Sequence, residues 1–137
     1  LEVKPGPNDS VLVDDAYNSN PKGFTSALET LDLLVREGGR RIVVTPGMVE
    51  LGADHDEEHT RLGKIAAEHA DLVLAIAPER MKTFVSAYQE AAGEREELHT
   101  FPGFAEADIW LQENTKAGDV VLLENDLPDL YERKLPI

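Results

Sequence analysis

Three clusters of polar residues each follow a short apolar segment of this 137-residue chain. They occupy residues 14–20, 45–52 and 124–126, and include the acids Asp15, Glu50 and Glu124. If the apolar segments are parallel strands, the clusters meet at the carboxyl edge of one sheet, where open α/β domains bind ligands. Carboxylates there can accept hydrogen bonds from hydroxyl groups, hold an ammonium group or take up a proton. We therefore expect a ligand site at this edge.

The adjacent acids Asp14 and Asp15 allow two interpretations. A phosphatase-like hydrolase would use one of them as its nucleophile, but that chemistry places a second acid two residues later, where this chain has none. Alternatively, one aspartate caps the following turn through the backbone, and residues 18–20 form the turn and the helix cap. The two residues alone leave both interpretations open.

Several familiar catalytic motifs are missing. The chain has no G-x-x-x-x-G-K-[ST] phosphate loop, no G-x-G-x-x-G after its first strand and no G-x-S-x-G nucleophile turn. His55 and His59 stand four residues apart on a predicted helix, a spacing that can bind zinc. Because acids surround them at residues 54–58, we interpret both as solvated surface residues and expect no metal site.

Hydrophobic periodicity predicts alternating strands and helices. Because the runs are apolar or β-branched, strands are expected at residues 10–13, 41–45, 71–76, 98–101 and 120–123. Apolar residues recur at helical spacing over residues 21–37, 54–69, 81–88 and 104–116. Asp54 and Glu57 predict a capping box at the second helix. This alternation predicts a three-layer, Rossmann-like α/β domain, with a mainly parallel sheet of about five or six strands and helices on both faces.

The first residues of the chain and its composition restrict the possible classes of protein and partner. Residues 1–9, with two prolines and a glycine, are interpreted as the remnant of an interdomain linker, and a start at Leu1 suggests a piece of a longer protein. No cysteine is present, which excludes disulfides, thiolate nucleophiles and cysteine metal sites. With 13 basic and 27 acidic residues the net charge is −14, so we expect neither nucleic acid nor membrane as partner.

The polar clusters, read together, resemble a known family. Residues 13–21, Val-Asp-Asp-Ala-Tyr-Asn-Ser-Asn-Pro, resemble the entry to the C-terminal domain of the Mur ligases, whose dipeptide-adding branch reads D-D-[SA]-Y-N-A-N-P. Residues 48–52 (Met-Val-Glu-Leu-Gly), His59, Gly63 and residues 118–122 (Gly-Asp-Val-Val-Leu) continue the match at similar spacing. The resemblance covers nearly the whole chain, residues 1–137.

The resemblance implies a lid domain of a larger enzyme. Mur ligases have a UDP-substrate domain, a central P-loop domain that binds ATP and Mg, and a last domain that closes over the nucleotide. The first two would lie outside this chain, so the isolated domain is expected to be inactive and to hold no catalytic residue by itself. The family joins an amine to a carboxylate activated as an acyl phosphate. We therefore expect a cytoplasmic ligase of peptidoglycan precursor synthesis and cell wall biogenesis.

The resemblance also suggests residue roles. Asp15 would approach the nucleotide ribose, with Tyr17, Asn18 and Asn20 in the same nucleotide-binding loop. Glu50 would either line the substrate site or belong to a loop that simply packs down.

The last strand departs from the family pattern. The dipeptide-adding branch continues there into K-G-S-R, whereas this chain has Glu124, Asn125 and Asp126. We expect these residues to bind or orient an acceptor that arrives as an ammonium group, either a small amine or a peptide; a solvated turn is the other interpretation. The leading hypothesis is thus an ATP-dependent amide-bond ligase domain, and the alternative is a standalone, non-catalytic α/β ligand-binding module.

Overall fold

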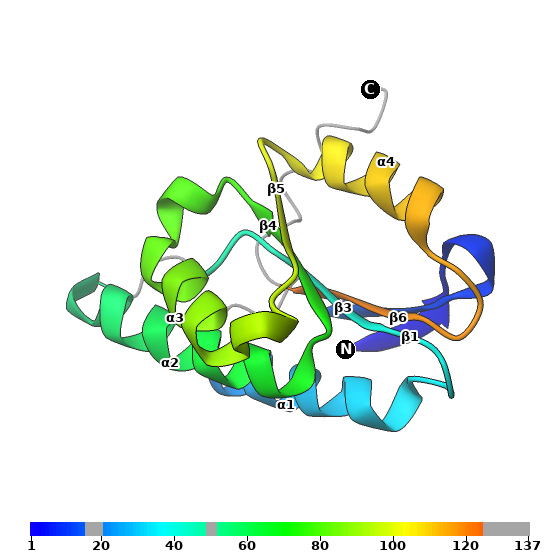
Figure 1. Cartoon of the computed structure of the whole chain (residues 1–137), viewed down its shortest axis with the longest axis horizontal. Coiled ribbons are helices and arrows are strands. Elements are labelled where there is room, and N and C mark those ends of the chain that lie inside the picture. The colour runs from blue at the N-terminus through cyan, green and yellow to red at the C-terminus, as the bar shows by residue number, and fades with distance from the viewer. Residues whose placement is uncertain (16–20, 49–51, 125–137) are drawn as a thin grey trace.

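The computed structural model describes residues 1–15, 21–48 and 52–124. Its centre is a six-stranded sheet in the order β1-β2-β6-β3-β4-β5 (Figure 1). β1 pairs antiparallel with β2, and the other pairs are parallel. The mainly parallel sheet predicted from the sequence is confirmed. The strands are β1 (Glu2–Pro5), β2 (Val11–Asp15), β3 (Arg41–Thr45), β4 (Leu72–Ile76), β5 (Leu98–Phe101) and β6 (Val120–Glu124).

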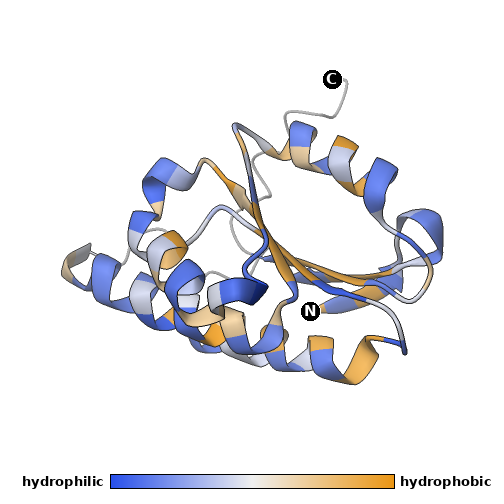
Figure 2. Cartoon of the chain, viewed as in Figure 1, coloured by the Kyte–Doolittle hydropathy of each residue, from blue (hydrophilic) through white to orange (hydrophobic). Residues whose placement is uncertain are grey.

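Helices cover both faces of the sheet. α1 (Pro21–Leu34), α2 (His55–His69) and α3 (Lys82–Ala92) lie on one face, and α4 (Phe104–Asn114) lies on the other (Figure 1). Figure 2 shows the strands between these two layers as the most hydrophobic part of the chain. This arrangement confirms the three-layer, Rossmann-like α/β fold. Short 3-10 helices precede or follow the main elements: η1 (Pro7–Asp9), η2 (Gly52–Asp54), η3 (Pro78–Arg80) and η4 (Gly93–Arg95).

Alternation along the strands divides the core into two clusters. On β3, Val43 packs in the cluster that contains Phe24 and Phe84 from α1 and α3. Its neighbour Ile42 points to the other face and packs in the cluster that contains Leu111 of α4. All residues of β4 and β6 are buried, as expected for central strands covered on both faces.

α2 and α3 approach each other closely at Gly63. A Cβ atom added to this glycine would lie 2.4 Å from the carbonyl oxygen of Phe84 and 3.0 Å from the Cβ of Ala87. Only hydrogen fits between the two backbones, so Gly63 fixes how α2 lies against α3.

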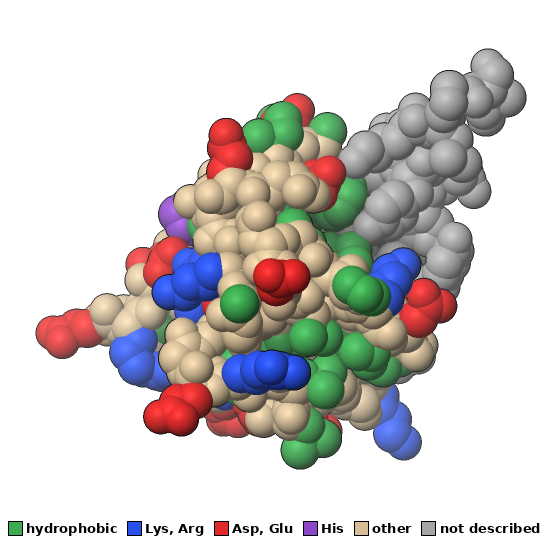
Figure 3. Space-filling model, turned by 90° about the vertical axis from the view of Figure 1, so that its right-hand side faces the viewer, with side chains coloured by type: hydrophobic (Ala, Val, Ile, Leu, Met, Phe, Trp, Pro, Cys, Tyr) green, Lys and Arg blue, Asp and Glu red, His purple; other side chains and the backbone are tan. Residues whose placement is uncertain are grey.

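A buried ion pair holds the opposite, amino edge of the sheet. Asp119 is 1% exposed and accepts hydrogen bonds from the backbone N–H of Arg40 at 2.8 Å and from its guanidinium at 2.9 Å. Burial raises the pKa of Asp119, but the hydrogen bonds from Arg40 and Lys116 outweigh it and leave the pKa below its ordinary value. Figure 3 looks onto this end of the molecule, where Lys or Arg and Asp or Glu side chains are interspersed.

Two local predictions are corrected by the structure. Residues 1–9, interpreted as a linker remnant, contribute the edge strand Glu2–Pro5 and the turn Pro7–Asp9. All four residues of β1 are exposed, so this strand forms through backbone pairing and has no buried apolar face. The predicted capping box is wrong, because Asp54 stands at the N-cap of α2 without a side-chain hydrogen bond to the helix.

Candidate functional site

β2 and β6 end together at the carboxyl edge of the sheet. The register pairs Asp15 with Glu124, the last residue of each strand. Asp15 is 5% exposed and Glu124 is 0% exposed. Parallel pairing therefore places two carboxyl groups from distant parts of the sequence next to each other, as the position of the polar clusters suggested.

Glu124 is a buried acid, and the positive charge of the Leu1 α-amino group near Asp15 offsets only part of its burial. Neither of its carboxyl oxygens has a hydrogen-bond partner of good geometry among the described residues. Burial raises the pKa of Glu124 to about 10, and the neighbouring Asp15 adds to this shift. At neutral pH the Glu124 carboxyl is therefore protonated. The interpretation of Glu124 as part of a solvated turn is wrong.

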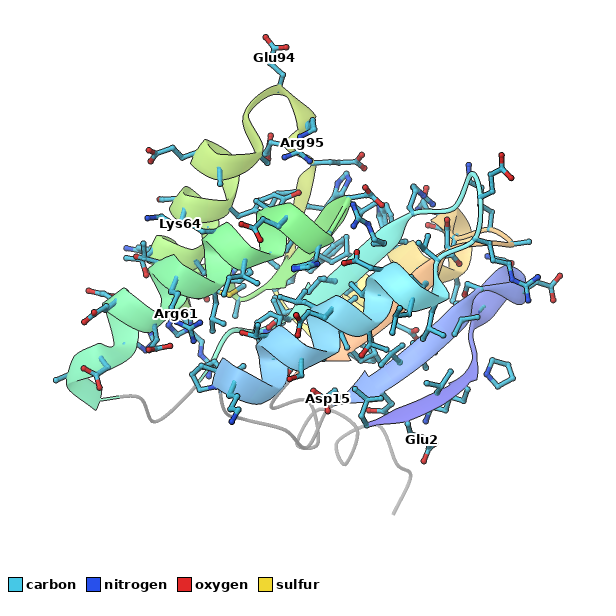
Figure 4. All side chains as sticks on the ribbon, turned by 90° about the horizontal axis from the view of Figure 1, so that it is seen from below. Glu2, Asp15, Arg61, Lys64, Glu94 and Arg95 are labelled. Carbon is cyan, nitrogen blue, oxygen red and sulfur yellow. The ribbon has the colours of Figure 1, made fainter. Side chains whose placement is uncertain are left out.

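Asp14 and Asp15 point to opposite sides of β2 and do not act together. Asp14 accepts a hydrogen bond from the Lys4 ammonium at 3.0 Å, on the side of the edge strand β1. Asp15 lies 3.8 Å from the α-amino group of Leu1. Figure 4 shows Asp15 at the end of its strand, while the labelled basic side chain Arg61 comes from α2. Because the two carboxylates diverge, the geometry gives no support to the phosphatase interpretation.

The chain leaves β3 through a buried segment. Residues 45–48 are all buried, and the Thr45 hydroxyl accepts the Gly47 backbone N–H at 3.0 Å. Gly47 has φ +83°, a left-handed conformation that glycine adopts without steric cost. The backbone N–H of Met48 donates to Nε2 of His59 at 3.0 Å. The exit from β3 is thus tied to α2 before the chain continues toward Glu50.

His59 is a functional candidate that the sequence analysis assigned to the surface. It is 0% exposed, and its Nδ1 lies 2.7 Å from the backbone oxygen of His55. Both ring nitrogens of His59 contact backbone groups, and Nε2 of His55 lies 3.0 Å from the backbone oxygen of Arg80. The pair therefore does not form the zinc site that its spacing allowed. A signal for burial existed, because His59, Leu62 and Ala66 share one helical face.

The other residues predicted for the site lie outside the described residues. Their roles stay predictions. They are Tyr17, Asn18, Asn20, Glu50, Asn125 and Asp126.

The described residues hold no group of three acidic, histidine or cysteine side chains able to bind a metal ion. No helix among them is long and apolar enough to cross a membrane. A surface cavity of about 530 Å³ lies between α2 and α3, lined by side chains such as Lys64 and Lys82. Neither Asp15 nor Glu124 lines it, so this cavity and the carboxyl pair are separate features.

Solved structures share the fold of this chain. The MurF ligase of Thermotoga maritima, determined in complex with ADP, superposes with a TM-score of 0.72 and 25% identity over 96% of this chain and 28% of that one. A single ligase domain from Haemophilus ducreyi gives a TM-score of 0.64 at 20% identity and covers 98% of this chain and 95% of its own. The second likeness shows the fold alone.

Sequence relatives lead to the same family. UDP-N-acetylmuramoyl-tripeptide–D-alanyl-D-alanine ligase of Escherichia coli K12 is 36% identical over 67 residues, which are 48% of this chain and 14% of the relative. Its Mycobacterium bovis counterpart is 40% identical over 58 residues, or 40% of this chain and 11% of the relative. The match thus spans a small part of these longer proteins. The family profile described as Mur ligase, glutamate ligase domain, matches residues 1–124, and the chain belongs to the Mur ligase family as its C-terminal domain.

Proposed function

We propose that this chain is the closing domain of a cytoplasmic, ATP-dependent amide-bond ligase of peptidoglycan precursor synthesis. The observation that carries the proposal is the family match over residues 1–124, supported by the likeness over 96% of the chain to a ligase solved with ADP. The partners of the domain are its own UDP-substrate and P-loop domains. Its contribution is to close over the nucleotide, exclude water and orient the acceptor amine for attack on an acyl phosphate.

The chemistry of the carboxyl edge suits one part of ATP. Phosphates need cations or backbone N–H donors, whereas Asp15 and Glu124 offer acids. Ribose hydroxyls are donors, and a carboxylate can accept from both. Asp15 therefore binds the ribose, with Tyr17, Asn18 and Asn20 in the same loop. The triphosphate and Mg are held mainly by the central domain.

The acceptor site uses the acids at the end of β6. Glu124 is protonated in the domain alone, and an ammonium group beside it favours loss of that proton because positive charge stabilises both carboxylates. Asn125 and Asp126 help to orient the amine, and Glu50 lines the same site. An acceptor whose far end is neutral or cationic suits this edge better than a dipeptide with a free carboxylate.

The test is a ligation assay on the full-length protein with ATP, Mg and UDP-N-acetylmuramoyl-tripeptide. A panel of amino acids, dipeptides and simple amines serves as acceptors, and phosphate release and amide product are both measured. We expect a product that forms only when an amine is present, and a preference for acceptors without a free carboxylate. The substitutions Glu124→Gln and Asp126→Asn should weaken this preference. If D-alanyl-D-alanine is the best acceptor, and neither variant changes the acceptor preference, the acceptor assignment is refuted. No product with any acceptor, together with a reading frame that lacks a P-loop, would favour the standalone binding module.

A further inference from the structure

The contacts of His59 define its protonation state. Its Nδ1 lies 2.7 Å from the backbone oxygen of His55, and an oxygen of this kind can only accept, so Nδ1 carries a hydrogen. Its Nε2 lies 3.0 Å from the backbone nitrogen of Met48, which can only donate, so Nε2 carries none. The two bonds together require a neutral imidazole protonated on Nδ1.

The surroundings of His59 leave little room for another arrangement. A Cβ atom added to Gly47 would lie 2.9 Å from Nε2 and 3.0 Å from the Cβ of Met81. Residues 45–48 are buried, and Gly47 is held by Thr45 as well. The exit of β3, the first turns of α2 and the start of α3 thus meet at one imidazole.

The charged groups around His59 act on its pKa in both directions. The His55 ring, 4.1 Å away, lowers the pKa of His59, while Asp56 and Glu58 on α2 raise it. The segment 45–48 and Met81 bring no titratable side chain. Burial is the largest influence and keeps the pKa of His59 below its ordinary value, although the hydrogen bond to the backbone oxygen of His55 raises it.

We propose that His59 is a positioning residue whose neutral imidazole holds residues 45–48, which leave β3 beside the end of β6 at the carboxyl edge, against α2, and that protonation of Nε2 releases this segment. That this edge serves the ligase reaction rests on the proposed function. A protonated Nε2 presents an N–H to the Met48 N–H, and two donors cannot bond. Acid therefore breaks the link between β3 and α2 at this point.

Two substitutions separate the two bonds of His59. His59→Gln can still accept from Met48 through Oε1 but loses the Nδ1 donor, and it no longer titrates. His59→Asn can still donate to His55 through Nδ2 but does not reach Met48. Hydrogen exchange of the Met48 amide and ¹⁵N spectra of His59 in the 137-residue chain report on the bond directly. Turnover and the Michaelis constant for ATP are measured in the full-length protein.

We expect the ¹⁵N spectrum to show the neutral, Nδ1-protonated form, and the Met48 amide to be protected in the parent and in His59→Gln. In His59→Asn its protection falls by about tenfold or more. Turnover falls in His59→Asn by about tenfold to a hundredfold while the Michaelis constant for ATP stays unchanged. In the parent, acidification lowers the protection of the Met48 amide from exchange and the turnover together. In His59→Gln, acidification lowers neither quantity.

Unchanged Met48 protection in His59→Asn would overturn the hydrogen-bond link. Loss of protection without loss of turnover would overturn the positioning role. If His59→Asn does not fold, the pH comparison between the parent and His59→Gln decides, and parallel pH profiles would overturn the proposal. If no substrate supports turnover, the proposed function fails, while the Met48 and ¹⁵N data still decide the link itself.

Discussion

Replacing Glu124 by Gln should stabilise this domain at neutral and alkaline pH, although it changes a fully buried residue. Burial and Asp15 raise the pKa of Glu124 to about 10 in the folded chain, against an ordinary value of 4.5. Between these values the folded state holds a proton at this carboxyl that the unfolded chain releases. The stability is therefore greatest below pH 4.5 and is lost as the pH rises through the folded pKa.

The expected size of the effect follows from the proton linkage. Each pH unit inside the window costs about 1.4 kcal/mol, so from about pH 5.5 to about pH 8.5 Glu124 lowers the free energy of unfolding by about 4 kcal/mol. This pH range lies between the unfolded and folded pKa values, so the free energy of unfolding falls with a constant slope across it. Glutamine keeps the shape of the side chain and an N–H donor without the proton exchange.

The assay is urea unfolding at several pH values, followed by far-UV circular dichroism for the parent and Glu124→Gln. Taking the difference between the two proteins cancels the titration of all other groups. Glu37→Gln, an exposed residue in the loop after α1, is the matched control and should leave the pH dependence unchanged. Parallel curves for the parent and Glu124→Gln would show that Glu124 ionises in the folded chain without cost, and would refute the reasoning.

Three further outcomes test other parts of the structure. Asp15→Asn in the full-length enzyme should raise the Michaelis constant for ATP by about tenfold or more, because a charge-assisted pair with the ribose is lost, whereas Asp14→Asn should not. Gly63→Ala should lower the free energy of unfolding by about 1–3 kcal/mol, since its Cβ would meet the Phe84 backbone; a more stable variant would mean that helix propensity prevails. Calorimetry on the 137-residue chain should detect no micromolar ATP binding, and such binding would contradict the division of the site between domains.

The central strands were predictable because burial on both faces leaves a continuous apolar run. Residues 71–76 and 120–123 are predicted as strands for this reason, and the structure has β4 and β6 there, each between two other strands of the sheet. β1 could not be found in the same way. Its four residues are exposed, and its conformation depends on backbone pairing with β2 rather than on side-chain pattern.

The location of the acids was predictable, but their environment was not. Strand ends place Asp15 and Glu124 at one edge, which follows from parallel topology. The burial of Glu124 follows from tertiary packing, and an acid before Asn125 in a chain of 27 acids gives no local sign of it. His59 differs from Glu124, because its spacing to Leu62 and Ala66 does indicate the buried face of α2. The acids around His59 led instead to the prediction of a surface residue.

The residue at position 124 decides the charge that this edge presents to a ligand. A lysine there, as in the K-G-S-R pattern of the dipeptide-adding branch, would form an ion pair with the aspartate beside it, and the pair would be neutral. Glu124 holds a proton and is neutral, so β6 brings no positive charge to Asp15 beside it. The cation near Asp15 is the α-amino group of Leu1, 3.8 Å away. The edge then favours ligands that bring hydroxyl donors or positive charge. One substitution at a strand end would thus be enough to change the proposed acceptor preference, while the fold and the proposed approach of Asp15 to the ribose would stay the same.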